Sequence, residues 1–145
     1  MDWGRDRWYD GKGNWIKKMK NSFFNIFLLI ITIVLALLSA YYVGTLYDTL
    51  FPHQLGGGFW GSRELDRFLA GFFGSFLFFL ISIFLAFGNA TKKVWILSFG
   101  IPALLLIIIL DFFIPHLLFH LSFPLLGWLI GMGVRRLING SNVYK

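Results

Sequence analysis

Three long stretches of this 145-residue chain carry almost no charged side chain. Residues 21–47 and 68–91 contain none, and Asp111 is the only one within residues 94–134. A helix that crosses a lipid bilayer needs about 20 consecutive, mostly apolar residues. Backbone polar groups in lipid must bond within the chain, which also favours helices. The stretches therefore predict an all-α integral membrane protein.

The third stretch is too long to be one span. A single helix over residues 94–134 would measure about 62 Å, roughly twice the hydrocarbon thickness. Asp111 and Pro115 mark the expected turn. We therefore expect one membrane domain, residues 1–145, folded as a four-transmembrane-helix bundle with spans at about 23–46, 68–88, 94–110 and 115–134. The remaining segments are an interfacial tail 1–20, an outer loop 48–66 and a C-terminal tail 135–145.

The basic residues predict the orientation of the spans. All but two of the 13 Lys and Arg residues lie in the N-terminal tail, at Lys92 and Lys93, or in the C-terminal tail. The exceptions are Arg63 and Arg67, which have acidic neighbours. The positive-inside rule then predicts that both termini are cytoplasmic, in a plasma or inner membrane. The net charge of +6 is a topology and lipid-headgroup signal, and no nucleic-acid partner is expected.

The segments outside the spans carry weaker signals. Tryptophans beside basic residues in the 1–20 tail are typical of the headgroup layer, whereas its glycines argue against a firm helix in its first half. In the outer loop, three consecutive glycines indicate flexibility, and Ser62 followed by Arg63, Glu64 and Leu65 marks a helix start.

The first two spans carry small or polar residues seven positions apart. Membrane helices prefer such residues at their contacts, and a seven-residue repeat implies a left-handed crossing. We expect the two spans to pack as an antiparallel hairpin, with chance placement of Ser and Thr as the alternative. The expected pairs, with Gly71 beside them, are Asn25 with Asn89, Thr32 with Ser82, and Ser39 with Ser75.

The fourth span contains a G-x-x-x-G pattern formed by Gly127 and Gly131. At 100° per residue these glycines share a face with His116 and His120. This face should contact another helix closely, either in the same chain or in another copy. In the third span, Pro102 predicts a kink, which either shapes packing or lines a transport site.

No catalytic motif is present, and the absence of cysteine excludes thiolate chemistry. The candidate ion or proton site is Asp111, His116 and His120, near the expected outer surface. Ionisable groups in membranes are functional candidates, and imidazoles titrate between about pH 5 and 8. The alternatives are interfacial packing and a metal or haem site. The one-turn spacing of His116 and His120 is compatible with one metal ion, but two ligands one helical turn apart cannot bracket a haem. We favour packing over a bound group, and we expect no cofactor, no metal and, without a catalytic motif, no enzymatic activity.

Two functions stay open. The first is an accessory, scaffold or assembly subunit of a larger or homo-oligomeric membrane complex, which the small-residue faces and scarce buried charge favour. The second is a small transporter or ion or proton channel component using Asp111, His116 and His120. The expected partners are the lipid bilayer and another membrane protein or a second copy, with no soluble substrate inferred.

Overall fold

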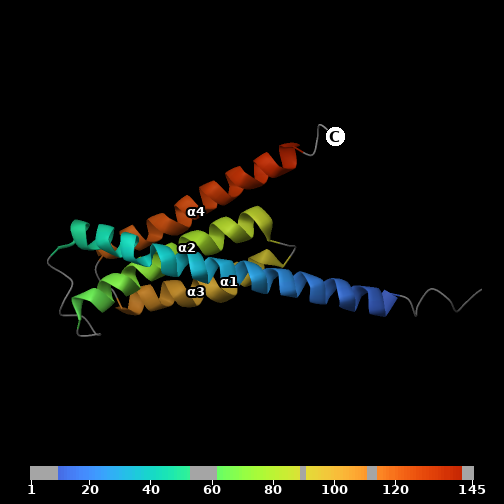
Figure 1. Ribbon diagram of the computed structural model, residues 1–145, viewed down its shortest axis with the longest axis horizontal. Helices are drawn as coiled ribbons and strands as arrows, with labels where there is room; N and C mark the ends of the chain where they lie inside the picture. Colours follow the sequence, from blue (N-terminus) through green and yellow to red (C-terminus); the bar gives the residue numbers. More distant parts are fainter. Residues whose placement is uncertain (1–9, 53–61, 89–90, 111–113, 142–145) are drawn as a thin grey trace, which may run out of the picture.

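The computed structural model describes residues 10–52, 62–88, 91–110 and 114–141, and within them it is entirely helical apart from short turns and caps. Each helix is long and apolar enough to cross a membrane. The expectation of an all-α chain with four membrane-length helices is confirmed. The helices are α1 (Asp10–Leu50), α2 (Arg63–Phe87), α3 (Lys92–Leu110) and α4 (Ile114–Ser141), as Figure 1 shows.

Helix α1 is much longer than the span expected at 23–46. It has 41 residues, which corresponds to about 62 Å and exceeds the hydrocarbon thickness. The helix includes Gly11 and Gly13, so these two glycines do not prevent it from forming. A glycine inside a helix costs only about 1 kcal/mol, and propagation from an existing apolar helix is much easier than nucleation. The N-terminal tail is therefore partly a continuation of the first span.

The ends of the helices follow local sequence signals. The Ser62 side chain accepts a hydrogen bond from the Leu65 amide and caps α2, and two acidic residues occupy the first turn. The helix start expected at Ser62 is confirmed. Pro115 lies in the first turn of α4, where its missing N–H would have no helical partner in any case. Two further prolines, Pro102 and Pro124, lie inside α3 and α4.

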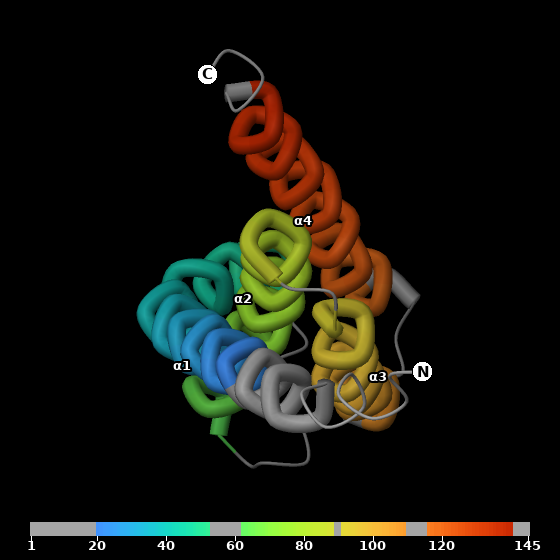
Figure 2. The backbone as a smooth tube through the Cα atoms, turned by 90° about the vertical axis from the view of Figure 1, so that its right-hand side faces the viewer, coloured from blue at the N-terminus to red at the C-terminus, as the bar shows by residue number. Residues whose placement is uncertain are grey.

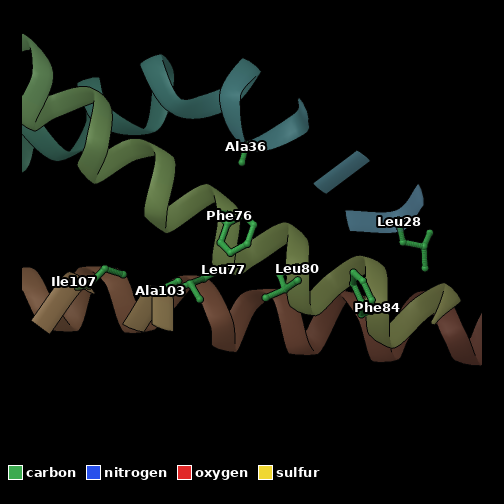
Figure 3. Close-up of a cluster of buried hydrophobic side chains, with 8 residues drawn as sticks. All are labelled: Leu28, Ala36, Phe76, Leu77, Leu80, Phe84, Ala103 and Ile107. Carbon is green, nitrogen blue, oxygen red and sulfur yellow. The ribbon is translucent and has the colours of Figure 1, made fainter. Parts of the chain in front are cut away.

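Helix α2 is the centre of the molecule. It packs against α1, α4 and α3, whereas α3 and α4 touch each other only slightly. The end-on view in Figure 2 shows α2 between the other three helices. The apolar core lies along α2 in Figure 3. Its members are Leu28 and Ala36 from α1, Phe76, Leu77, Leu80 and Phe84 from α2, and Ala103 and Ile107 from α3.

Glycines let α1 approach α2 closely. A Cβ atom at Gly71 would overlap the Ala40 carbonyl and the Gly44 amide, and one at Gly44 would overlap the Arg67 carbonyl. Small residues are what membrane helices use to bring two backbones together. The structure thus places Gly71 in the contact between the first two spans.

The polar residues predicted to join the first two spans differ in their hydrogen-bond partners. Thr32 donates to the Leu28 carbonyl and Ser39 to the Leu35 carbonyl, both within α1. Ser82 instead faces α4, where its hydroxyl donates to the Gly127 carbonyl over 3.1 Å. Ser75 is buried, and Asn89 lies outside the described residues. A seven-residue spacing gives the depth of a residue along a helix but not the neighbour that it meets.

The G-x-x-x-G face of α4 contacts α2 of the same chain. A Cβ atom at Gly127 would lie 2.6 Å from the Phe78 carbonyl oxygen, and one at Gly131 would lie 2.8 Å from the Ser82 carbonyl oxygen. Both distances are too short for a side chain, so glycine is required at each position. Beyond this contact α4 diverges from the other helices toward its C-terminal end (Figure 1).

Basic residues gather at one end of the molecule. The helices alternate in direction, so the starts of α1 and α3 lie at the same end as the final turns of α2 and α4 (Figure 1). This end, here called the basic end, carries Lys20, Lys92, Lys93, Arg135 and Arg136. The opposite end carries Arg63 and Arg67. The charge asymmetry seen in the sequence is thus an asymmetry between the two ends of the fold.

Candidate functional site

Two histidines and a tyrosine meet at the end of the molecule opposite the basic end. His116 and His120 lie one turn apart at the start of α4, and Tyr47 lies in the last turn of α1. Their exposed fractions are 4%, 3% and 3%. Chain direction explains the meeting, because α1 ends where α4 begins. We call Tyr47, His116 and His120 the Tyr–His cluster.

A short hydrogen bond joins the two helices. The Tyr47 hydroxyl oxygen lies 2.7 Å from Nδ1 of His116. An imidazole protonated on Nε2 accepts this bond from the phenol, whereas one protonated on Nδ1 donates it. The Tyr47 ring also packs against His120, with 5.6 Å between ring centroids. Two imidazoles and a phenol therefore share one buried location.

Phenylalanines enclose the cluster. Phe51 packs against His116 with ring centroids 4.5 Å apart, and Phe119 packs edge-on against Tyr47 at 5.3 Å. Phe119 also contacts Phe123 on the next turn of α4. Aromatic side chains thus pack directly against the buried cluster.

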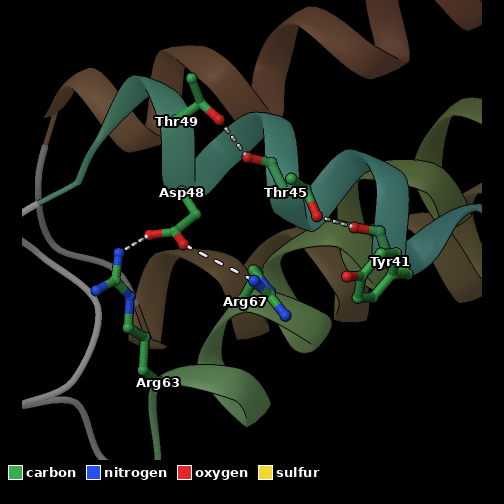
Figure 4. A network of polar contacts seen from close by, with 6 residues as sticks. All are labelled: Tyr41, Thr45, Asp48, Thr49, Arg63 and Arg67. Atoms are coloured by element: carbon green, nitrogen blue, oxygen red, sulfur yellow. Dashed lines mark hydrogen bonds and ion pairs between the residues drawn. The ribbon is translucent and has the colours of Figure 1, made fainter.

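An ion-pair network lies next to the cluster and ties α1 to α2. Asp48 contacts Nη2 of Arg63 at 2.6 Å and Nη1 of Arg67 at 3.9 Å. Arg67 also lies over the Tyr41 ring, 5.2 Å from its centroid. Figure 4 shows these three charged side chains between the end of α1 and the start of α2. The two basic residues at this end thus share one carboxylate.

The structure locates only part of the predicted ion site. His116 and His120 lie together, as the helical spacing requires, while Asp111 lies outside the described residues. Within the described ranges, no group of three or more His, Asp or Glu side chains is arranged to hold a metal ion. The chemistry available to the cluster is hydrogen bonding and proton exchange among the phenol and the imidazoles.

Sequence reasoning missed Tyr47 and Asp48 as members of these contacts. It paired Arg63 and Arg67 only with acidic neighbours along the chain. Asp48 follows the first uncharged stretch and Arg67 precedes the second, so an antiparallel hairpin would bring the two to similar depth. That signal is readable in the sequence, whereas the rotation that turns Tyr47 toward α4 is not.

Comparisons of the chain with protein-family models, with curated proteins and with solved structures found no match. We therefore infer function from the geometry of the described residues. The relevant facts are a buried Tyr–His cluster at one end, an apolar core along α2 and a basic opposite end.

Proposed function

We propose that this chain is an accessory, scaffold or assembly subunit of a larger or homo-oligomeric membrane complex. The observation that carries the proposal is the contrast between the inside and the outside of the fold. Tyr47 bonds to His116 and Ser82 to Gly127, so these buried polar groups use partners within the chain. The outward surface of the helices exposes many large apolar side chains.

Helix α4 is the part of the fold that best suits a membrane partner. Only one edge of it packs on α2, and a Cβ atom at Gly133 would meet nothing within 4 Å. A small residue on an outward helix face lets a second helix approach closely. The large exposed side chains of this surface are Leu125, Leu126, Trp128, Leu129, Ile130, Leu137 and Ile138.

We further propose that both termini are cytoplasmic and that the membrane is a plasma or inner membrane. The support is the charge asymmetry between the ends of the fold. The basic end collects most of the described Lys and Arg side chains, while Arg63 and Arg67 at the other end share Asp48. Positive side chains are enriched on the cytoplasmic side of membrane proteins.

A pair of glycine variants tests the assembly role. Gly133→Leu places a large side chain on the outward face of α4, where nothing in the chain obstructs it, and should reduce association while leaving the fold intact. Its control is Gly100→Ala on α3, where the nearest atom to an added Cβ is a Leu80 methyl at 3.6 Å. The measurement is particle size in lipid nanodiscs. An unchanged particle size for Gly133→Leu would count against α4 as the contact surface.

A small transporter or a proton or ion channel component that uses Asp111, His116 and His120 is the second candidate function. The buried Tyr47–His116 hydrogen bond favours it, because linked exchangeable protons are what a relay requires. The core along α2, however, is filled by the apolar side chains of Leu77, Leu80 and Phe84. These side chains cannot pass a proton further along the helix. For this reason we rank it second.

Proton flux into liposomes that contain the purified protein tests this alternative. The double variant His116→Gln and His120→Gln keeps side-chain volume and hydrogen bonding but removes titration. A flux that the wild type supports and the folded double variant loses would establish the transporter class. Equal flux for the two proteins, or none for either, would leave the histidines as packing residues.

A further inference from the structure

The basic end contains a second polar location, where α1 meets the start of α3. Asn25 of α1 is fully buried, with an exposed fraction of 0%. Its Nδ2 lies 2.9 Å from the Thr91 hydroxyl oxygen. The Thr91 carbonyl accepts from the Val94 and Trp95 amides, so α3 starts from this residue. The Asn25 amide group is therefore held against the N-terminus of α3.

Two buried polar atoms at this location have no hydrogen-bond partner among the residues that the structure describes. They are Oδ1 of Asn25 and Nζ of Lys92, the first residue of α3. A buried polar atom without a partner is costly, and an enclosed ammonium without a counter-charge is more so. Both side chains neighbour Thr91, because Asn25 bonds to it and Lys92 follows it in the chain.

An anion is bound by N–H donors and positive charge, and this location offers both. The oxygen and nitrogen of an asparagine amide can exchange places, after which the Thr91 hydroxyl donates to Oδ1 and the NH₂ group becomes the free end. The Val94 and Trp95 amides already bond to the Thr91 carbonyl, but the helix dipole adds positive potential at the start of α3. The Lys92 ammonium supplies a full positive charge. The asparagine amide, the Lys92 ammonium and the start of α3 are thus neighbours in this part of the fold.

We propose that Lys92, Asn25 and the start of α3 bind a phosphate group, supplied by the headgroup of an anionic phospholipid. Helix N-termini commonly bind phosphate. The depth is appropriate, because α3 begins here and headgroups lie at the ends of spans. Thr91 is exposed, so the location lies at the surface of the fold. Lys20, Lys93, Arg135 and Arg136 at the same end attract anionic lipids.

The test measures lipid binding by native mass spectrometry and by thermal shift. The protein is held in nanodiscs of phosphatidylcholine, and phosphatidylglycerol or inorganic phosphate is added. Wild type should retain phosphatidylglycerol and melt at a higher temperature when it is present. Lys92→Gln should weaken binding about tenfold or more, because a charge-assisted hydrogen bond is lost. The matched control, Lys93→Gln, removes an exposed charge on the same helix turn and should bind nearly as wild type.

Asn25→Asp provides a second variant of nearly equal size. Its carboxylate still accepts from Thr91 but repels an anion, so binding should fall while the melting temperature in phosphatidylcholine alone does not. A response to inorganic phosphate as strong as that to the lipid would identify free phosphate as the ligand of the same site. Equal losses for Lys92→Gln and Lys93→Gln, or no response of wild type to either ligand, would overturn the proposal.

Discussion

The contact between Tyr47 and His116 is a buried polar pair that joins the end of α1 to the start of α4. The hydroxyl oxygen and Nδ1 are 2.7 Å apart, and both side chains are buried. In such surroundings a lost partner costs more than the bond itself contributes, because the remaining polar atom stays buried. The pair can therefore fix the rotation of α4 against α1. The sequence indicates the helical face of His116 but not the identity of its partner.

Tyr47→Phe should destabilise the fold by about 1 kcal/mol, since it removes the hydroxyl, keeps the ring and leaves the imidazole nitrogen without this partner. Unfolding of the detergent-solubilised protein measures the effect. Tyr42→Phe is the matched control, because Tyr42 lies in the same helix and is 75% exposed. If the two variants have the same free energy of unfolding, the Tyr47–His116 bond does not stabilise the fold.

Asp48→Asn tests the ion pairs at the same end. Because Arg63 is half exposed, the pairs lie in a partly solvated setting, where each contributes about 1 kcal/mol or less. We expect a small loss of stability that shrinks as salt is added. Glu64→Gln, at an exposed position on α2, should change stability less. A loss for Asp48→Asn that salt does not affect would contradict an electrostatic role.

At the scale of helices, the four-helix pattern and the approximate spans follow from the uncharged stretches. Hydropathy is a property of consecutive residues along the chain, so it can be read without knowing which helices are neighbours. Close approaches between helices do not follow as directly. Gly71 was expected at the contact between α1 and α2, and it lies there against Ala40 and Gly44. Ser82, on the same predicted stripe, meets α4 instead. The rotation of each helix about its axis depends on all of its neighbours at once, so a repeat in one helix cannot specify it.

Gly71→Ala should therefore destabilise the hairpin of α1 and α2 by about 1–3 kcal/mol, because the new methyl overlaps backbone atoms of α1. Gly133→Ala is the control. Its methyl meets nothing within 4 Å, so better helix propensity should leave the fold equally stable or stabilise it by up to about 1 kcal/mol. The readout is the free energy of unfolding in detergent micelles. Similar losses at both positions would mean that α1 and α2 do not approach closely at Gly71.

At the scale of the whole molecule, the two main features are the concentration of basic residues at one end and the exposed apolar surface of α4. The basic end predicts the side of the membrane on which both termini lie. Single cysteines substituted at Lys145 or Lys93 should react with a membrane-impermeant label from the cytoplasmic side. A cysteine substituted at Gly57 should react from the opposite side. The sequence alone supports this prediction, since it depends on which residues flank each uncharged stretch. A terminus labelled from the outer side would contradict the proposed orientation.

The mass of the particle extracted from its own membrane tests the proposed function most directly. Extraction into lipid nanodiscs without detergent preserves helix contacts, and native mass spectrometry then weighs the protein inside. An assembly role requires a particle heavier than one 16.7 kDa chain, either a multiple of that mass or the chain together with a second membrane protein. A single chain of 16.7 kDa in every particle would contradict it.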